Sequence, residues 1–159
     1  KLKLKLATTN DTSTIYQLAD KIWHHHYVPI VGLEQVDYML DLMYSNEALT
    51  NQMKEGHNFY LIEKDDKNIG FLGLSGADEV FIHKFYIDQE LQGRGYGKEV
   101  FRLIQLECPN AVSYTLTVNR QNFKSINFYF KLGFKIDHID DFDIGNGYFM
   151  NDFIMKYKC

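Results

Sequence analysis

The sequence is poor in features that would assign it to several large classes of protein. It contains two cysteines, Cys108 and the terminal Cys159, and no cysteine or histidine spacing typical of a disulfide framework or a zinc site. No apolar run reaches the roughly 18 residues that cross a bilayer, and the first residues lack the continuous apolar stretch of a signal peptide. We therefore expect a cytoplasmic protein without a membrane partner. Because the sequence does not begin with methionine, a removed leader stays open.

An excess of positive charge is also missing. The chain has 17 Lys and Arg against 21 Asp and Glu, which gives a formal net charge of −4. This balance excludes a broad phosphate-binding face for duplex nucleic acid. The run from Trp23 to Tyr27 holds three consecutive histidines, but neighbouring positions on a helix point in different directions. We therefore expect no nucleic-acid partner and no metal.

Apolar and aromatic residues, by contrast, are plentiful. Of 159 residues, 45% are hydrophobic, and the chain has 11 Tyr and 12 Phe. A chain of this length buries roughly two-thirds of the surface that its unfolded form exposes, so it needs neither metal nor disulfides for stability. We expect one domain over residues 1–159.

Changes in hydrophobic period predict the order of helices and strands. Lys1 to Leu6 alternates like a strand, and a helix with capping-box spacing between Thr14 and Gln17 runs to about His26, where Pro29 and Gly32 break it. The remaining predicted segments are helices at 36–43, 47–54, 97–108 and 122–131, and strands at 59–64, 69–74, 79–88, 113–118, 134–142 and 148–157. This order predicts an α/β fold, a mixed and mostly antiparallel sheet with helices on both faces.

A glycine-rich turn, residues 92–97, lies between a predicted strand and a predicted helix. Backbone N–H groups at a helix start attract anions, and glycines let an anion approach closely. Arg94 and Lys98 add positive charge, so pyrophosphate is the expected ligand, with a tight turn that binds nothing as the alternative. A Walker loop is excluded because Glu99 follows Lys98, and the dinucleotide fingerprint requires glycine where Lys98 stands.

The turn instead has the form Gln-x-x-Gly-x-Gly, with Gln92, Gly95 and Gly97. A second pattern follows one strand later, and its members are Leu116-Thr117-Val118, Asn122, Ser125, Phe128-Tyr129 and Leu132-Gly133-Phe134. With both patterns, the chain resembles the GNAT superfamily of acyl-CoA-dependent N-acetyltransferases. The resemblance implies a sheet with splayed fourth and fifth strands and acetyl-CoA as cofactor. It also implies direct attack by a primary amine within a ternary complex.

The resemblance further implies roles for individual residues. Tyr129 would protonate the coenzyme A sulfur, since a phenol with a pKa near 10 stays protonated at neutral pH; the alternative is a tyrosine that only packs in the core. Asn122 would hold the pantetheine or phosphate arm, and the strand before the turn would pair with the pantetheine amides. The expected cofactor contacts are Phe85, Tyr86, Ile87, Gln92, Gly93, Arg94, Gly95, Tyr96, Gly97, Lys98, Asn119, Asn122, Ser125 and Tyr129.

The general base and the acceptor amine stay open. Glu79 and His83 are the candidate bases, and strict alternation would put both on one strand face with Phe81 and Phe85; a water-mediated base is the alternative. The residues expected to border the acceptor are Trp23, His26 and Tyr27. The acceptor is a small-molecule or peptide amine, and a homodimer is left open. The competing functions are a non-catalytic acyl-CoA-binding module and a nucleotide-dependent transferase.

Overall fold

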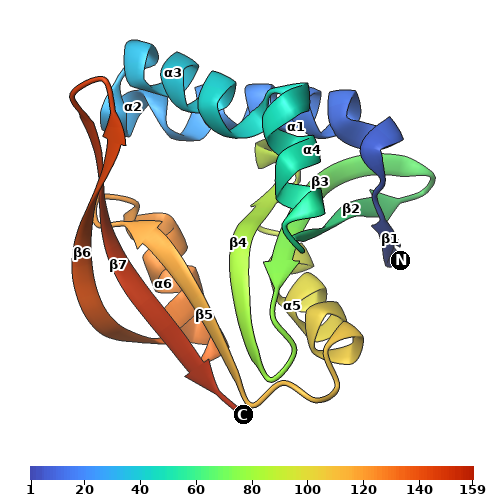
Figure 1. Ribbon diagram of the computed structural model, residues 1–159. Helices are drawn as coiled ribbons and strands as arrows, with labels where there is room; N and C mark the ends of the chain where they lie inside the picture. The colour runs from blue at the N-terminus through green and yellow to red at the C-terminus, as the bar shows by residue number, and fades with distance from the viewer.

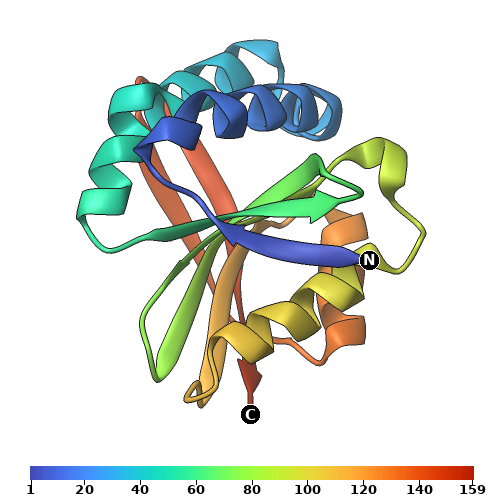
Figure 2. The same ribbon diagram turned by 90° about the vertical axis from the view of Figure 1, so that its right-hand side faces the viewer.

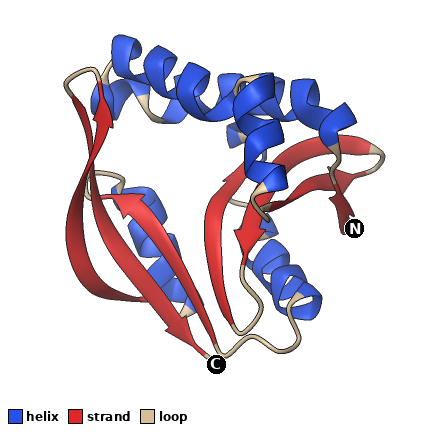
Figure 3. Cartoon of the chain, in the orientation of Figure 1, coloured by secondary structure: helices blue, strands red, loops and turns tan.

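The computed structural model describes all residues, 1–159, as a seven-stranded sheet with helices on both faces (Figures 1 and 3). None of the helices combines the length and the apolar character needed to cross a membrane. In chain order the elements are β1 (Leu2–Leu6), the 3-10 helix η1 (Thr9–Asp11), α1 (Thr12–His26), α2 (Val28–Val31), α3 (Leu33–Tyr44), α4 (Asn46–Lys54), β2 (Asn58–Lys64), β3 (Lys67–Ser75), β4 (Glu79–Ile87), the 3-10 helix η2 (Gln89–Leu91), α5 (Tyr96–Glu107), β5 (Ser113–Asn119), α6 (Phe123–Leu132), β6 (Lys135–Gly145) and β7 (Tyr148–Lys158).

The strand order in the sheet is β1-β2-β3-β4-β5-β7-β6. Every neighbouring pair is antiparallel except β4 and β5, which run parallel. The predicted mixed and mostly antiparallel sheet is therefore confirmed.

The parallel pair β4–β5 is short. Residues 79–82 of β4 pair with residues 113–116 of β5, and beyond that point the two strands separate. In Figure 1 they lie together near the C-terminus and diverge towards α1 and α3. This confirms the predicted splay. Along the facing edges of the two upper halves, backbone N–H and C=O groups have no strand partner and are open to water or a ligand.

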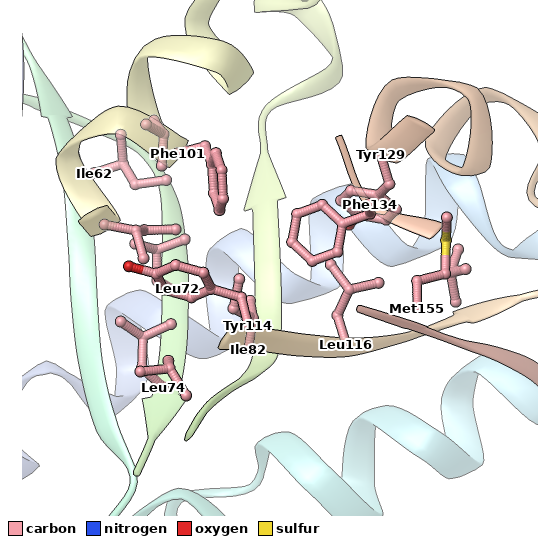
Figure 4. Packing of buried hydrophobic residues seen from close by; sticks show 14 of the residues in the cluster. Ile62, Leu72, Leu74, Ile82, Phe101, Tyr114, Leu116, Tyr129, Phe134 and Met155 are labelled. Carbon is pink, nitrogen blue, oxygen red and sulfur yellow. The ribbon is translucent and has the colours of Figure 1, made fainter. Parts of the chain in front are cut away.

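Two hydrophobic cores lie on opposite faces of the sheet. Helices α5 and α6 cover one face, where Phe101 and Tyr129 pack over Ile82 and Leu116 (Figure 4). Helices α1, α3 and α4 cover the other face, and Figure 2 shows the two helical layers separated by the sheet. A ligand that passes between β4 and β5 therefore connects the two faces.

A β-bulge in β4 changes which side chains share a face. Opposite Gly73 and Leu74 of β3, strand β4 presents Lys84 and Ile82, so His83 is an extra residue in the ladder. Because one inserted residue reverses the alternation, the expectation that His83 and Phe85 share a face is wrong. The ring of Phe85 lies near Tyr129 (6.4 Å between centroids) on the α5–α6 face, while His83 belongs to the other face.

The start of the helical region also differs in detail from the sequence prediction. The capping box forms between Thr8 and Asp11 instead of Thr14 and Gln17. Pro29 does not end the helical block, because it occupies the first turn of α2, where proline needs no N–H donor. The first helix ends at His26, as predicted, and Gly32, whose φ of 89° is in the left-handed region, ends α2.

The close packing of β3 on β4 leaves very different amounts of space for a side chain at two glycines of β3, Gly70 and Gly73. A Cβ at Gly70 would lie 2.2 Å from the Tyr86 carbonyl oxygen, whereas a Cβ at Gly73 would meet the Lys84 side chain at an ordinary 3.5 Å. We expect Gly70→Ala to lower the free energy of unfolding by about 1–3 kcal/mol, because backbone must move. Gly73→Ala should change it by less than about 1 kcal/mol. Urea denaturation measures both, and equal losses would contradict the register described here.

Candidate functional site

Three adjacent cavities follow the split between β4 and β5. The outer groove lies between the glycine-rich turn, α5 and α6; the split pocket lies between the two strands; the inner pocket lies between α1, α3, β4, β5 and β7. The outer groove and the split pocket share His26, Gln92 and Tyr129 among their lining residues. The split and inner pockets share Tyr27 and Thr117. The cavities thus lie next to one another in a series from one face of the sheet to the other.

The outer groove ends at the first turn of α5. Gly93 and Gly95 have φ of 81° and 76°, which bends the chain so that the helix begins at Tyr96. The first helical bond of α5 is donated by the Glu99 N–H to the Gly95 carbonyl (3.2 Å). The N–H groups of residues 96–98 precede that bond and have no helical partner, which is the arrangement that the expected anion site requires.

Gly97 is required for a different reason from the one expected. A Cβ there would lie 2.6 Å from Cζ of Phe128, a ring that lines the outer groove. Glycine at this position therefore allows α6 to pack against α5, besides leaving the backbone accessible. Of the two basic residues predicted to attract phosphate, Lys98 lines the groove, whereas Arg94 is exposed and lies outside its lining.

The side chain of Gln92 connects three segments around the groove. Its amide nitrogen lies 3.0 Å from Nε2 of His26 at the end of α1, and its oxygen accepts a hydrogen bond from the Lys124 ammonium on α6. Burial lowers the pKa of His26, and the charges of His25 and Lys124 lower it further. Lys124 lines the groove but was not predicted, although it lies between Asn122 and Ser125, two of the expected cofactor contacts.

Tyr129 lies where the outer groove meets the split pocket and is 9% exposed. Burial raises the pKa of its phenol well above the ordinary value, so the group is protonated at neutral pH. Asn122, which lines the split pocket, caps α6 through its Oδ1, which accepts the Ser125 N–H at 3.3 Å. The structure therefore brings Tyr129, Asn122, Ser125 and Gln92 to one cavity.

The two candidate bases are separated in the structure. His83 lines the split and inner pockets, where its Nε2 lies 2.7 Å from the Ser75 hydroxyl and its ring stacks on His57 (4.0 Å). Burial, helped by the charges of His57 and Lys84, lowers the pKa of His83 to about 4. Glu79 is exposed at the start of β4 and lines none of the three cavities.

The inner pocket holds two predicted acceptor residues, Trp23 and Tyr27. His26, the third, lines the other two cavities instead. Asn119 was expected at the cofactor but lines the inner pocket, and its Oδ1 accepts the Gln121 N–H (2.9 Å). The difference arises because the splay turns the end of β5 towards α3.

Two charged residues of the inner pocket were missed by sequence reasoning. Asp152 of β7 is 2% exposed, and desolvation raises its pKa to about 6 although the Thr117 hydroxyl and the Arg120 charge oppose the shift. Lys84 is 8% exposed, donates to the Gln52 side-chain oxygen (2.8 Å), and desolvation lowers its pKa to about 8. Asp152 could have been noticed as a single acidic residue between Met150 and Ile154 in a strand of alternating pattern. Lys84 could not, because the bulge changes the face of the sheet on which its side chain lies.

With this geometry in view, comparisons with known proteins identify the family. The family profile described as "Acetyltransferase (GNAT) domain" matches residues 29–145. The chain belongs to the GNAT family of acetyltransferases. It is an acyl-CoA-dependent N-acetyltransferase with acetyl-CoA as cofactor and an amine as acceptor, as the two sequence patterns predict.

Individual relatives are more distant. The chain is 24% identical to a spermidine N(1)-acetyltransferase of Thermoplasma acidophilum, over 99% of this chain and 97% of the relative. It is 29% identical to the peptidyl-lysine N-acetyltransferase YjaB of Salmonella typhimurium, over 60% of this chain and 63% of that protein. The crystal structure of the PaiA N-acetyltransferase from Thermoplasma acidophilum in complex with coenzyme A has a TM-score of 0.83 at 24% identity, over 100% of this chain and 99% of that one. This likeness confirms the fold.

The contact between Gly97 and Phe128 gives a test of the outer groove. We expect Gly97→Ala to push the Phe128 ring into the groove and weaken coenzyme A binding about tenfold, equivalent to about 1.4 kcal/mol. Adding Phe128→Leu should recover most of the affinity, because the shorter side chain makes room for the methyl group. Isothermal titration of the single and double variants measures this, and strictly additive losses would contradict the contact.

The half-buried, neutral His83 gives a pH dependence of stability. Its pKa is about 4 in the folded protein and near 6.5 when unfolded, so between these values the unfolded chain binds more protons. The contribution of His83 to stability should therefore fall as the pH drops from about 6.5 to 4, so the free energy of unfolding of wild type should fall more steeply over this range than that of His83→Phe. His25→Phe, at an exposed position, should leave the wild-type slope unchanged. Thermal unfolding across this pH range measures the slopes, and identical slopes for His83→Phe and wild type would refute the assignment.

Proposed function

We propose that residues 1–159 act as one domain that transfers an acetyl group from acetyl-CoA to a primary amine by direct attack within a ternary complex. The series of adjacent cavities, from the outer groove through the split pocket to the inner pocket, supports this proposal. Cofactor and acceptor enter it from opposite ends and meet between β4 and β5. We place the reaction in the cytoplasm, since both cysteines are free thiols.

The cofactor would occupy the outer groove and the split pocket. The unpaired N–H groups of residues 96–98 suit the pyrophosphate, and Lys98 and Lys124 add positive charge. The open edge of β4 at residues 85–87 suits the pantetheine amides, which would bind as an added strand does. This arrangement puts the thioester in the split pocket, beside Tyr129.

Tyr129 is the proposed general acid. A thiolate leaves when the amine has attacked, and the protonated phenol at the junction of the two cavities can donate its proton to the sulfur. Direct attack is favoured over an acyl-enzyme because neither Cys108 nor Cys159 lines any of the three cavities.

The acceptor class follows from the relatives and the inner pocket together. The names of the relatives specify spermidine and peptidyl-lysine, which share a primary amine at the end of an unbranched methylene chain. Met39 and Met43 of α3 and Met150 of β7 line the inner pocket, and flexible thioethers pack well along such a chain. We propose an acceptor of this type, either free or as a lysine side chain.

Replacement of Tyr129 by phenylalanine tests the function. We expect turnover to fall roughly 100-fold, because the proton donor is lost, while the affinity for coenzyme A stays within about threefold since the ring remains in place. A thiol-release assay with spermidine measures turnover, and titration with coenzyme A measures binding. Tyr16→Phe, on an exposed tyrosine of α1, is the matched control and should have no effect.

Other outcomes would favour the competing functions. Stabilisation by acetyl-CoA without thiol release for any amine in a panel would indicate a binding module that has lost catalysis. Stronger thermal stabilisation by ATP than by acetyl-CoA would indicate a nucleotide-dependent transferase. The presence of Tyr129 at the junction of the cavities favours the enzyme.

A further inference from the structure

Asp152 is a buried carboxylate without a positively charged partner. It is 2% exposed, and no lysine, arginine or histidine nitrogen lies within 4 Å of its side-chain oxygens. Arg120 donates instead to the Asp152 backbone carbonyl (3.1 Å) and to the Asp141 carboxylate (2.7 Å). The Lys84 ammonium is bonded to Gln52. The nearby cations are therefore engaged elsewhere.

A buried carboxylate in this condition is unusual, because buried charges in native proteins are normally paired or fully hydrogen-bonded. Asp152 does not face a closed core but lines the inner pocket, which lies next to the split pocket and shares wall residues with it. A ligand that carries a positive group into this pocket would provide the partner that the protein itself lacks.

Four aromatic side chains line the same pocket and suit a cation. Trp23 and Tyr27 have ring centroids 4.4 Å apart, and Tyr44 and Tyr86 lie 5.7 and 5.9 Å from Trp23. Aromatic faces attract ammonium groups, most strongly where water is excluded. A carboxylate and several rings around one cavity recognise a primary ammonium better than a neutral or anionic group.

The position of Asp152 relates this recognition to the reaction. Thr117 lines both the split pocket and the inner pocket, and its hydroxyl favours the ionised form of Asp152 by lowering the pKa of that carboxyl. Asp152 therefore lies beside the boundary that an amine crosses to reach the thioester. Burial raises the pKa of Tyr27, which lines both pockets, and the charge of Asp152 adds to that shift.

We propose that Asp152 holds the acceptor ammonium in the inner pocket and takes one proton from it before attack. The lone pair so released forms the C–N bond with the thioester carbonyl carbon, and the C–S bond breaks. The sulfur takes the proton of Tyr129, whose oxygen regains one from the new amide nitrogen through solvent, and Asp152 releases its proton to solvent. This role rests on the proposed function and adds the residue that selects and deprotonates the amine.

The pH dependence of the reaction reports on this carboxylate. Since its pKa is raised to about 6, kcat/KM for the amine should rise as the pH increases through about 6. His83 titrates near 4 and Lys84 near 8, so neither coincides with this limb. The titratable and charged groups around Asp152 are His83, Lys84 and Tyr86 from β4, Tyr27 from α1, Tyr44 from α3, Arg120 after β5, and Asp140 and Asp141 from β6.

The test compares Asp152→Asn with Asp140→Asn. Asp140 pairs with Asp152 across β6 and β7, so it gives the same change of charge nearby, but it is exposed. We expect Asp152→Asn to lower kcat/KM for 1,4-diaminobutane at least 100-fold and to remove the limb near pH 6. Asp140→Asn should stay within about threefold of wild type, and the affinity for acetyl-CoA should be unchanged in both variants. A capped lysine peptide in parallel assays distinguishes a lysine side chain from a free amine as the source of the ammonium.

Two further measurements keep the proposal separate from the proposed function. Titration of 1,4-diaminobutane into the complex with coenzyme A should show binding to wild type and none to Asp152→Asn, whether or not turnover occurs. Thr117→Val, which removes the hydroxyl that favours ionisation, should move the limb to higher pH. Retention of kcat/KM within about threefold by Asp152→Asn, or an equal loss in Asp140→Asn, would overturn the role of Asp152. Amine binding that depends on Asp152 without any thiol release would overturn the proposed function alone.

Discussion

The structure depends on the point where β4 and β5 stop pairing. Four residues on each strand form the parallel ladder, and beyond Ile82 and Leu116 the strands separate. The bulge at His83 accompanies this separation, as expected because a bulge bends its strand and increases its twist. The backbone groups left open on both edges create the only break in an otherwise continuous sheet. The edge of β4 proposed to bind the cofactor, the proposed proton donor Tyr129 and the pocket proposed to bind the acceptor all lie around that break.

The same bulge determines which side chains of β4 lie on each face of the sheet. Without it, Lys84 and Phe85 would each lie on the opposite side of the sheet. With it, Phe85 packs near Tyr129 on the face of α5 and α6, where the cofactor groove lies. Lys84 and Tyr86 are turned to the face of α1 and α3, where the inner pocket lies. One inserted residue therefore supplies an apolar wall to one cavity and polar groups to the other.

Sequence reasoning succeeded where chemistry is local and failed where it depends on register. Periodicity gave the order of the elements. The pattern from Gln92 to Gly97 predicted the turn and helix start on which the proposed anion site depends, because a strand, a turn and a helix start are contiguous in the chain. The partners of that site come from elsewhere, and Lys124 carries no motif of its own. The carboxylate of Asp152 becomes buried only when β7 pairs with β5 and neighbouring residues exclude water from it. Such burial is a property of the assembled sheet.

Burial around the inner pocket shifts the pKa values of three ionisable side chains, each in the direction that favours its uncharged form. Desolvation lowers the pKa of His83 to about 4 and of Lys84 to about 8, and raises that of Asp152 to about 6. At neutral pH the histidine is therefore uncharged and the carboxylate is mostly ionised. The lysine keeps its charge, but that charge lies over Tyr44 and Phe59 and is bonded to Gln52. An entering ammonium thus meets an anion and no charged imidazole, so His83 favours the acceptor by remaining neutral and not by acting as the base.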